Sequence, residues 1–144
     1  MFLKLKLKRK RGFTLMELLI VLVIVGLLAS IVGPALYKRV KPAKQSAARA
    51  QMTNYATALD SFFVDVGRYP STSDGLIVLR ANANSIAKWD GPYIQKDLAK
   101  DPWGYPFQYR SPTDKDPYEI FTYGADGKEG GEDENKDIYS WQSE

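Results

Sequence analysis

Acidic residues crowd one short segment near the end of this 144-residue chain. Residues 124–137 read Gly-Ala-Asp-Gly-Lys-Glu-Gly-Gly-Glu-Asp-Glu-Asn-Lys-Asp. Calcium takes about six to eight oxygen ligands in an irregular shell, which suits a flexible loop of this composition. Asp133, Asn135 and Asp137 offer oxygens at alternate positions, and two adjacent glycines let the chain turn back toward Asp126. A calcium site and a solvated acidic loop are both compatible with this pattern.

The loop is not an EF-hand. Asp126 to Asp137 span twelve positions with Gly131 at the sixth, but Lys128 and Gly130 stand where the third and fifth ligands belong. Other chemistry is excluded by composition, because the chain has no Cys and no His. A thiolate nucleophile, a Ser-His-Asp triad, a disulfide and the usual structural zinc site all need one of these residues. The sequence also shows no pair of residues suited to acid–base catalysis, so we expect no enzymatic activity.

A single carboxylate, Glu17, lies at the start of a long apolar run. Leu18–Leu36 contains nineteen residues without a charge, enough to span about 28 Å as a helix, close to the thickness of a bilayer core. Six of the 20 Lys and Arg lie in the first twelve residues, which places the N-terminus in the cytoplasm. A cleaved signal peptide is the alternative, although the sequence after the run matches its cleavage site poorly.

The position of Glu17 has two interpretations. Thr14-Leu15-Met16-Glu17 fits a capping box, in which Thr and Glu satisfy each other's backbone N–H groups at a helix start. A carboxylate in hydrocarbon is costly, however, and usually has a partner. Cleavage after Gly12 would remove all six leading cations and create an ammonium group at Phe13, on the same helix face as Glu17.

The segment Lys10-Arg11-Gly12-Phe13-Thr14-Leu15-Met16-Glu17-Leu18-Leu19 resembles the prepilin-peptidase recognition sequence of type IV pilins and type II secretion pseudopilins. The resemblance implies that a membrane aspartic peptidase cleaves after Gly12 and that the same enzyme N-methylates Phe13. It also implies that Glu17 pairs with the N-terminal amine of a neighbouring subunit.

The remainder predicts an α+β domain. Ala48, Met52, Tyr55, Leu59, Phe62 and Val66 form one apolar stripe, typical of a helix that packs on a core rather than in a coiled coil. We expect helix over 13–66, bent or loosened at Pro34 and Pro42, and a short helix over 76–83. Pro- and Gly-rich turns with large aromatics should cover the core. Strands are expected at 107–110, 118–123 and 138–141. Together they give a long helix on a small three-stranded antiparallel sheet.

Further segments resemble the major pseudopilin of type II secretion, general secretion pathway protein G. They are Gly67-Arg68-Tyr69-Pro70, Asp74-Gly75-Leu76, Gly91-Pro92-Tyr93, Lys100-Asp101-Pro102-Trp103-Gly104 and Gly124-Ala125-Asp126-Gly127. The resemblance implies a type IV pilin-like fold with one structural Ca²⁺ in the C-terminal loop. Its implied ligands are the Tyr123 backbone carbonyl and the side chains of Asp126, Asp133, Asn135 and Asp137. The lack of Cys favours a pseudopilin over an adhesive pilin, which more often carries a C-terminal disulfide.

These observations give a functional expectation. Residues 1–12 form a leader, 13–36 a transmembrane and filament-core helix, and 37–144 a periplasmic domain that includes an amphipathic helix over 37–66. The resemblance implies a self-polymerising pseudopilus subunit in the inner membrane. Its expected partners are minor pseudopilins, the prepilin peptidase and the inner-membrane assembly platform. Nucleic acid is not an expected partner, because after the leader 14 cations face 17 anions. The alternative is a type IV pilin used for adhesion, motility or DNA uptake.

Overall fold

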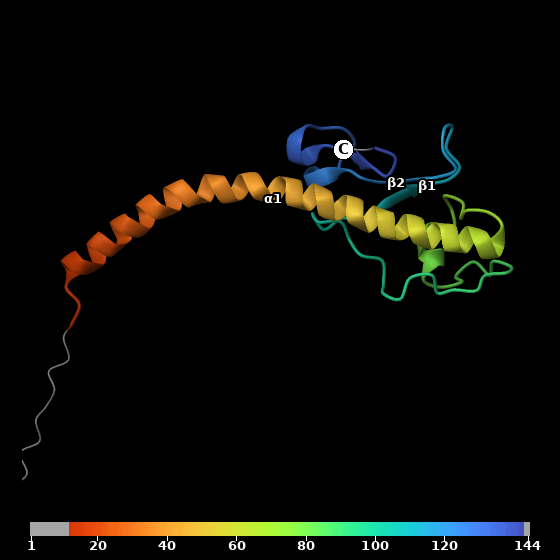
Figure 1. Cartoon of the computed structure of the whole chain (residues 1–144), viewed down its shortest axis with the longest axis horizontal. Coiled ribbons are helices and arrows are strands. Elements are labelled where there is room, and N and C mark those ends of the chain that lie inside the picture. Colours follow the sequence, from red (N-terminus) through yellow and green to blue (C-terminus); the bar gives the residue numbers. More distant parts are fainter. Residues whose placement is uncertain (1–11, 143–144) are drawn as a thin grey trace, which may run out of the picture. The chain divides into compact units, whose positions relative to one another are not determined.

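The computed structural model describes residues 12–142, except for the side chain of Lys38. Of the predicted leader, only Gly12 is among these residues; the rest lies outside them. The described chain has one long helix, a three-stranded sheet and three short 3₁₀ helices (Figure 1). It divides into two compact units, one up to Arg39 and one from Val40 onward, each described here by itself.

Helix α1 (Leu15–Val66) is continuous over 52 residues. Helical backbone runs through Pro34 and Pro42 without interruption. That these prolines bend or loosen the helix stays a prediction. Gly67 ends the helix with a φ of 82°, a left-handed conformation that glycine adopts without a steric penalty. Its N–H donates to the carbonyl of Phe63 at 2.8 Å, which completes the last turn.

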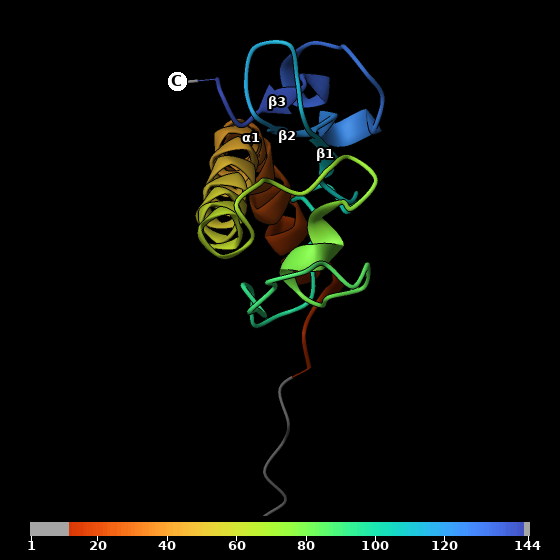
Figure 2. The same ribbon diagram turned by 90° about the vertical axis from the view of Figure 1, so that its right-hand side faces the viewer.

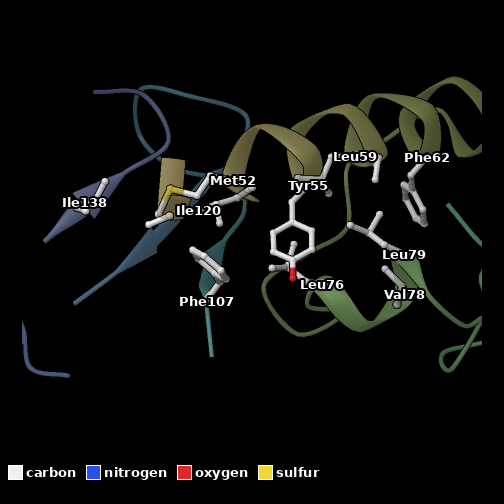
Figure 3. Packing of buried hydrophobic residues seen from close by; sticks show 12 residues of the cluster. Met52, Tyr55, Leu59, Phe62, Leu76, Val78, Leu79, Phe107, Ile120 and Ile138 are labelled. Carbon is white, nitrogen blue, oxygen red and sulfur yellow. The ribbon is translucent and has the colours of Figure 1, made fainter. Parts of the chain in front are cut away.

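The predicted apolar stripe of α1 forms the core of the second unit. Five of its six members are fully buried, and the sixth, Val66, packs against them. Met52 lies beside Ile120 and Ile138 of the sheet, whereas Leu59 and Phe62 face the segment after the helix (Figure 3). Tyr55 lies between the two groups, and its hydroxyl accepts a hydrogen bond from the N–H of Ala99 at 2.8 Å. The interpretation of the stripe as core-facing is therefore confirmed.

The sheet contains β1 (Gln108–Arg110), β2 (Glu119–Thr122) and β3 (Ile138–Tyr139), in the order β1-β2-β3. Both pairings are antiparallel, as predicted, although each strand is shorter than expected. In Figure 2 this sheet and the segment with the first 3₁₀ helix lie on the same side of α1, with the sheet above the segment. Ile120, Thr122 and Ile138 are almost completely buried.

Phe121 alternates with Ile120 and Thr122 along β2, so its side chain points to the opposite face of the sheet, but it is also buried. The guanidinium of Arg110 lies 4.5 Å from the centre of its ring, and Tyr139 stacks against it at 5.3 Å. Trp141 in turn stacks on Tyr139. These side chains give the outer face of the sheet a small aromatic cover of its own.

The segment after α1 corrects one prediction. Instead of a helix over 76–83, the chain forms the 3₁₀ helix η1 (Leu76–Leu79) and then turns. The Leu79 carbonyl accepts from the N–H of Tyr93 at 2.8 Å and not from the residue four positions on, which ends the helical pattern. The Asn82 side chain then closes a turn, accepting from the N–H of Ile86 and donating to its carbonyl. Further along, Trp89, Tyr93 and Trp103 pack on the core as expected of the aromatic turns.

Candidate functional site

The N-terminal motif starts α1 as a reciprocal cap. The N–H of Glu17 donates to the Thr14 hydroxyl at 3.2 Å, and the N–H of Thr14 donates to the Glu17 carboxylate at 3.5 Å. These two contacts are the capping box predicted from the sequence. Gly12 and Phe13 precede the helix, and Phe13 is 78% exposed. The predicted cleavage point therefore lies in accessible, non-helical chain immediately before the cap.

The first unit presents an apolar surface on which no other described part of the chain packs. Every residue from Phe13 to Leu36 is exposed. In the described part of the chain, α1 is the one helix long and apolar enough to cross a membrane. Exposed apolar area on this scale is unfavourable in water, so it requires lipid or another protein surface.

Small residues leave room for close contact along this helix. A Cβ atom added at Gly26 or Gly33 would meet nothing within 4 Å. The hydroxyl of Ser30 donates to the carbonyl of Leu27 at 2.7 Å, so its polar atom is already satisfied within the helix. Ala29 adds a fourth small side chain. Such residues let two helices approach closely in a membrane or a filament core.

The acidic loop connects β2 to β3 and folds onto itself. It contains η2 (Gly124–Asp126) and η3 (Asp133–Asn135). Gly124 has a φ of 72°, and a Cβ atom there would lie 2.7 Å from the carbonyl oxygen of Glu134. A Cβ atom at Gly131 would likewise lie 2.7 Å from the carbonyl oxygen of Asn135. The two ends of the loop are thus in backbone contact, and glycine is what permits it.

Asp137 is the buried carboxylate of the loop. It is 9% exposed, and its Oδ2 accepts hydrogen bonds from the N–H of Gly130 at 2.9 Å and from the hydroxyl of Tyr139 at 3.4 Å. Its Oδ1 is buried and has no hydrogen-bond partner among residues 12–142. An unpaired buried carboxylate oxygen is costly, so this atom has an unmet need for a cation or a donor.

The other predicted ligands differ in environment. Asp126 is exposed, and its Oδ1 accepts from the N–H of Lys128 at 3.2 Å. Tyr123 directly precedes η2, and Asn135 is half-buried between the two glycines. Among residues 12–142, no three Asp or Glu side chains gather closely enough to hold one metal ion. The structure therefore brings Asn135 beside Gly124 but does not assemble the carboxylates.

Asp133 is turned toward α1. Its side chain is 85% exposed and forms an ion pair with the ammonium group of Lys41, and its carbonyl accepts from Gln45 Nε2 at 3.3 Å. The hydrogen bond from Lys41, and then its charge, hold the pKa of Asp133 below its ordinary value. Neither Lys41 nor Gln45 was predicted as a loop partner.

Two family models match the chain. One, described as type II secretion system protein G, matches residues 35–141, and the other, the prokaryotic N-terminal methylation motif, matches residues 7–33. The chain belongs to the type II secretion system protein G family. The first match includes the whole acidic loop and its α1 contacts, and the second includes Gly12, Phe13 and Glu17.

Relatives and a solved structure agree with this assignment to the protein G family. The chain is 40% identical to the type II secretion system core protein G of Pseudomonas aeruginosa, over 94% of this chain and 98% of that protein. It is 42% identical to the core protein G of Vibrio cholerae, over 94% of each. The crystal structure of the major pseudopilin from the type 2 secretion system of enterohaemorrhagic Escherichia coli matches with a TM-score of 0.61 and 30% identity, over 74% of this chain and 93% of that chain.

Helix periodicity offered a signal for the missed α1 contacts of this protein G chain. Lys41 and Gln45 precede Ala48 and Met52 by one to three turns and share their core-facing side. The stripe predicted from apolar residues started at Ala48, because a polar side chain does not by itself indicate that its position is buried. Extended toward the N-terminus, the same helix face predicts that Lys41 and Gln45 contact the rest of the domain.

Proposed function

We propose that this chain is a structural subunit that polymerises into the periplasmic pseudopilus of a type II secretion system and drives protein export across the outer membrane. The observation that carries the proposal is the protein G family match together with a methylation motif at the start of a fully exposed apolar helix. Such a helix needs partners along its length, and head-to-tail contacts that do not close a ring produce filaments.

Processing would prepare the chain for this assembly. In this proposal a prepilin peptidase cleaves after Gly12 and N-methylates Phe13, and Glu17 then pairs with the amine of the neighbouring subunit. The exposed position of Phe13 beside the cap supports access to the cut. A carboxylate among apolar helices is tolerable when an opposite charge from the next subunit matches it.

The proposed topology follows from the charge pattern. The Lys- and Arg-rich leader keeps the N-terminus in the cytoplasm, residues 13–36 span the inner membrane, and residues 37–144 lie in the periplasm. Minor pseudopilins, the prepilin peptidase and the inner-membrane assembly platform are the proposed partners. We assign the chain no enzymatic role and no nucleic-acid partner.

Gene deletion separates this function from that of a type IV pilin. We expect a deletion strain to accumulate exoproteins in the periplasm, with twitching motility unchanged and secretion restored by the wild-type gene. Loss of twitching with normal secretion would instead identify a pilin for adhesion, motility or DNA uptake.

We also propose that the acidic loop holds one Ca²⁺ through the Tyr123 carbonyl and the side chains of Asp126, Asp133, Asn135 and Asp137. The donor set consists of oxygens, which a hard cation prefers, and the unpaired buried Oδ1 of Asp137 gives it a ready ligand. Bound calcium would supply positive charge that ties the strand before the loop to the strand after it. The remaining carboxylates must move closer for this, which the backbone glycines of the loop allow.

Melting of the full-length chain in detergent tests the calcium site. At about a hundredfold excess over Kd, calcium should stabilise the fold by about 2.7 kcal/mol, which raises Tm by several degrees. The Asp126→Ala variant should lose this response. Asp114→Ala, which removes an exposed carboxylate in the turn between β1 and β2, should keep it. An unchanged calcium response in Asp126→Ala would place the site elsewhere.

A further inference from the structure

Two side chains of α1 hold the acidic loop at η3. The Lys41 ammonium group pairs with Oδ1 of Asp133, and Gln45 donates to the main-chain carbonyl of the same residue. Asp133 has a φ of 56°, an uncommon conformation for a residue other than glycine. Two residues on one side of α1 therefore bind both the carboxylate and the backbone carbonyl of Asp133.

We propose that Lys41 is the counter-ion of Asp133 in the calcium-free chain and that calcium binding displaces it. This inference rests on the proposed calcium site. The ammonium group engages a carboxylate oxygen that a loop-bound cation would take as a ligand, so Lys41 and calcium compete for Asp133. Lys41 thereby sets the calcium affinity of the loop without being a ligand itself.

The exposure of the pair makes this exchange feasible. The Asp133 side chain is 85% exposed and that of Lys41 is 33% exposed. Exposed ion pairs contribute little to stability, because water and salt screen them and two long side chains must be held in place. The binding free energy of a divalent cation held by several oxygens at once exceeds the contribution of such an ion pair. An ammonium group adjacent to bound calcium would also be repelled by it.

The exchange at the Asp133 carboxylate leaves the other contact between the loop and α1 in place. Gln45 contacts the carbonyl of Asp133 and not its carboxylate, so this hydrogen bond does not compete with a metal at the side chain. Gly124 and Gly131 keep the two ends of the loop in backbone contact independently of Lys41. We therefore expect calcium to free the Lys41 ammonium group while the loop stays attached to α1.

Amine reactivity in the wild-type, full-length chain tests the exchange directly. The chain in detergent is acetylated briefly, with and without calcium, and the extent of modification at each lysine is read by peptide mass spectrometry. Lys41 should react several-fold faster when calcium is present. Lys44 lies three residues away on the same helix and forms no ion pair with any residue of 12–142, so its reactivity should not change and it serves as an internal control.

Calorimetric calcium titrations of Lys41→Met and Lys44→Met provide the second measurement. Both variants remove one positive charge from the same stretch of α1, but only Lys41→Met removes the competing group. Lys41→Met should bind calcium about two- to fivefold more tightly than Lys44→Met, as expected for loss of an exposed pair. Its metal-free Tm should also be lower, so that calcium raises it further. Lys41→Gln, which keeps a neutral donor, should show the same order of affinities if Lys41→Met folds poorly.

The possible failures are distinguishable. A wild-type chain that neither binds calcium nor melts higher in its presence overturns the calcium site itself. A wild-type chain that binds calcium while the reactivity of Lys41 stays constant overturns the exchange alone. Calcium binding by Lys41→Met that equals that of Lys44→Met would likewise overturn the competition, and weaker binding would show that Lys41 supports the bound state.

Discussion

At the scale of single residues, Asp74 organises the chain just after α1. Its carboxylate accepts hydrogen bonds from the N–H of Ser71 at 2.9 Å, from Arg68 at 3.0 Å and from the amide of Asn84 at 2.9 Å. Its side chain is only 12% exposed. Burial raises the pKa of Asp74, but the hydrogen bonds from Ser71, Asn84 and Arg68 lower it by more, so its net pKa lies well below the ordinary value.

This lowered pKa predicts acid sensitivity. Because the ionised carboxylate is favoured in the folded chain, its contribution is present above the unfolded pKa of about 3.9 and is lost as the pH falls below that value. Asp74→Asn should cost about 1–3 kcal/mol of unfolding free energy at neutral pH. It should also flatten the decline of stability below about pH 5. The measurement is denaturant unfolding of the full-length chain from neutral pH down to below about pH 4. Asp114→Asn, which changes an exposed carboxylate, is the matched control. Parallel pH profiles for the two variants would contradict this role.

At the scale of elements, the contact between η2 and η3 depends on backbone rather than on side chains. Gly124 adopts a positive φ, and its α-carbon faces the main chain of Glu134 and Asn135. Gly67, at the end of α1, also has a positive φ but has open space around it. Alanine at Gly67 would therefore introduce backbone strain alone, whereas alanine at Gly124 would introduce backbone strain and a steric clash.

We predict different costs for alanine at these glycines. Gly67→Ala should lose about 1 kcal/mol, since an L-residue is strained at its φ. Gly124→Ala should lose more, because its Cβ would lie 2.7 Å from a backbone oxygen that cannot rotate away. It should also weaken any calcium response, since the loop ends would move apart. Thermal melts of both variants, with and without calcium, provide the comparison, and equal costs would mean that the loop yields freely.

The sequence predicted the elements that follow a long-range pattern and was less successful where contacts between separate segments decide. The α1 stripe was correct because burial repeats at helical spacing over many turns. The helix expected over 76–83 was wrong beyond Leu79, because the Leu79 carbonyl accepts from the N–H groups of Tyr93 and Ile94 instead of continuing a helix. The ion pair between Lys41 and Asp133 joins residues 92 positions apart. Helix periodicity places Lys41 on the core-facing side of α1, but it does not indicate which distant residue Lys41 contacts.

At the scale of the whole molecule, Glu17 should decide whether subunits join. Glu17→Gln keeps an oxygen that can accept from the N–H of Thr14, so the cap and the start of α1 should survive. The charge that would meet a neighbour's amine is lost. We expect normal cleavage after Gly12 by mass spectrometry of the N-terminus, but at least a tenfold loss of pseudopili and of secretion, in line with about 1.4 kcal/mol or more per contact.

Wild-type Glu17 and Glu17→Gln should be compared at equal membrane levels, so that degradation is not mistaken for a failure to assemble. Glu17→Asp supplies a charged control of similar size. Normal fibres from Glu17→Gln would show that the carboxylate serves the cap alone.

The place of the cap has a consequence for maturation. Thr14 begins the first turn of α1 from within the part of the chain that remains after the proposed cut. Severing the bond after Gly12 would thus remove a basic tail and expose an amine while every helical hydrogen bond stays in place. Maturation in this protein would change the charge at the N-terminus of α1 without changing the fold of the helix. A subunit could therefore be fully folded in the bilayer before cleavage allows it to polymerise.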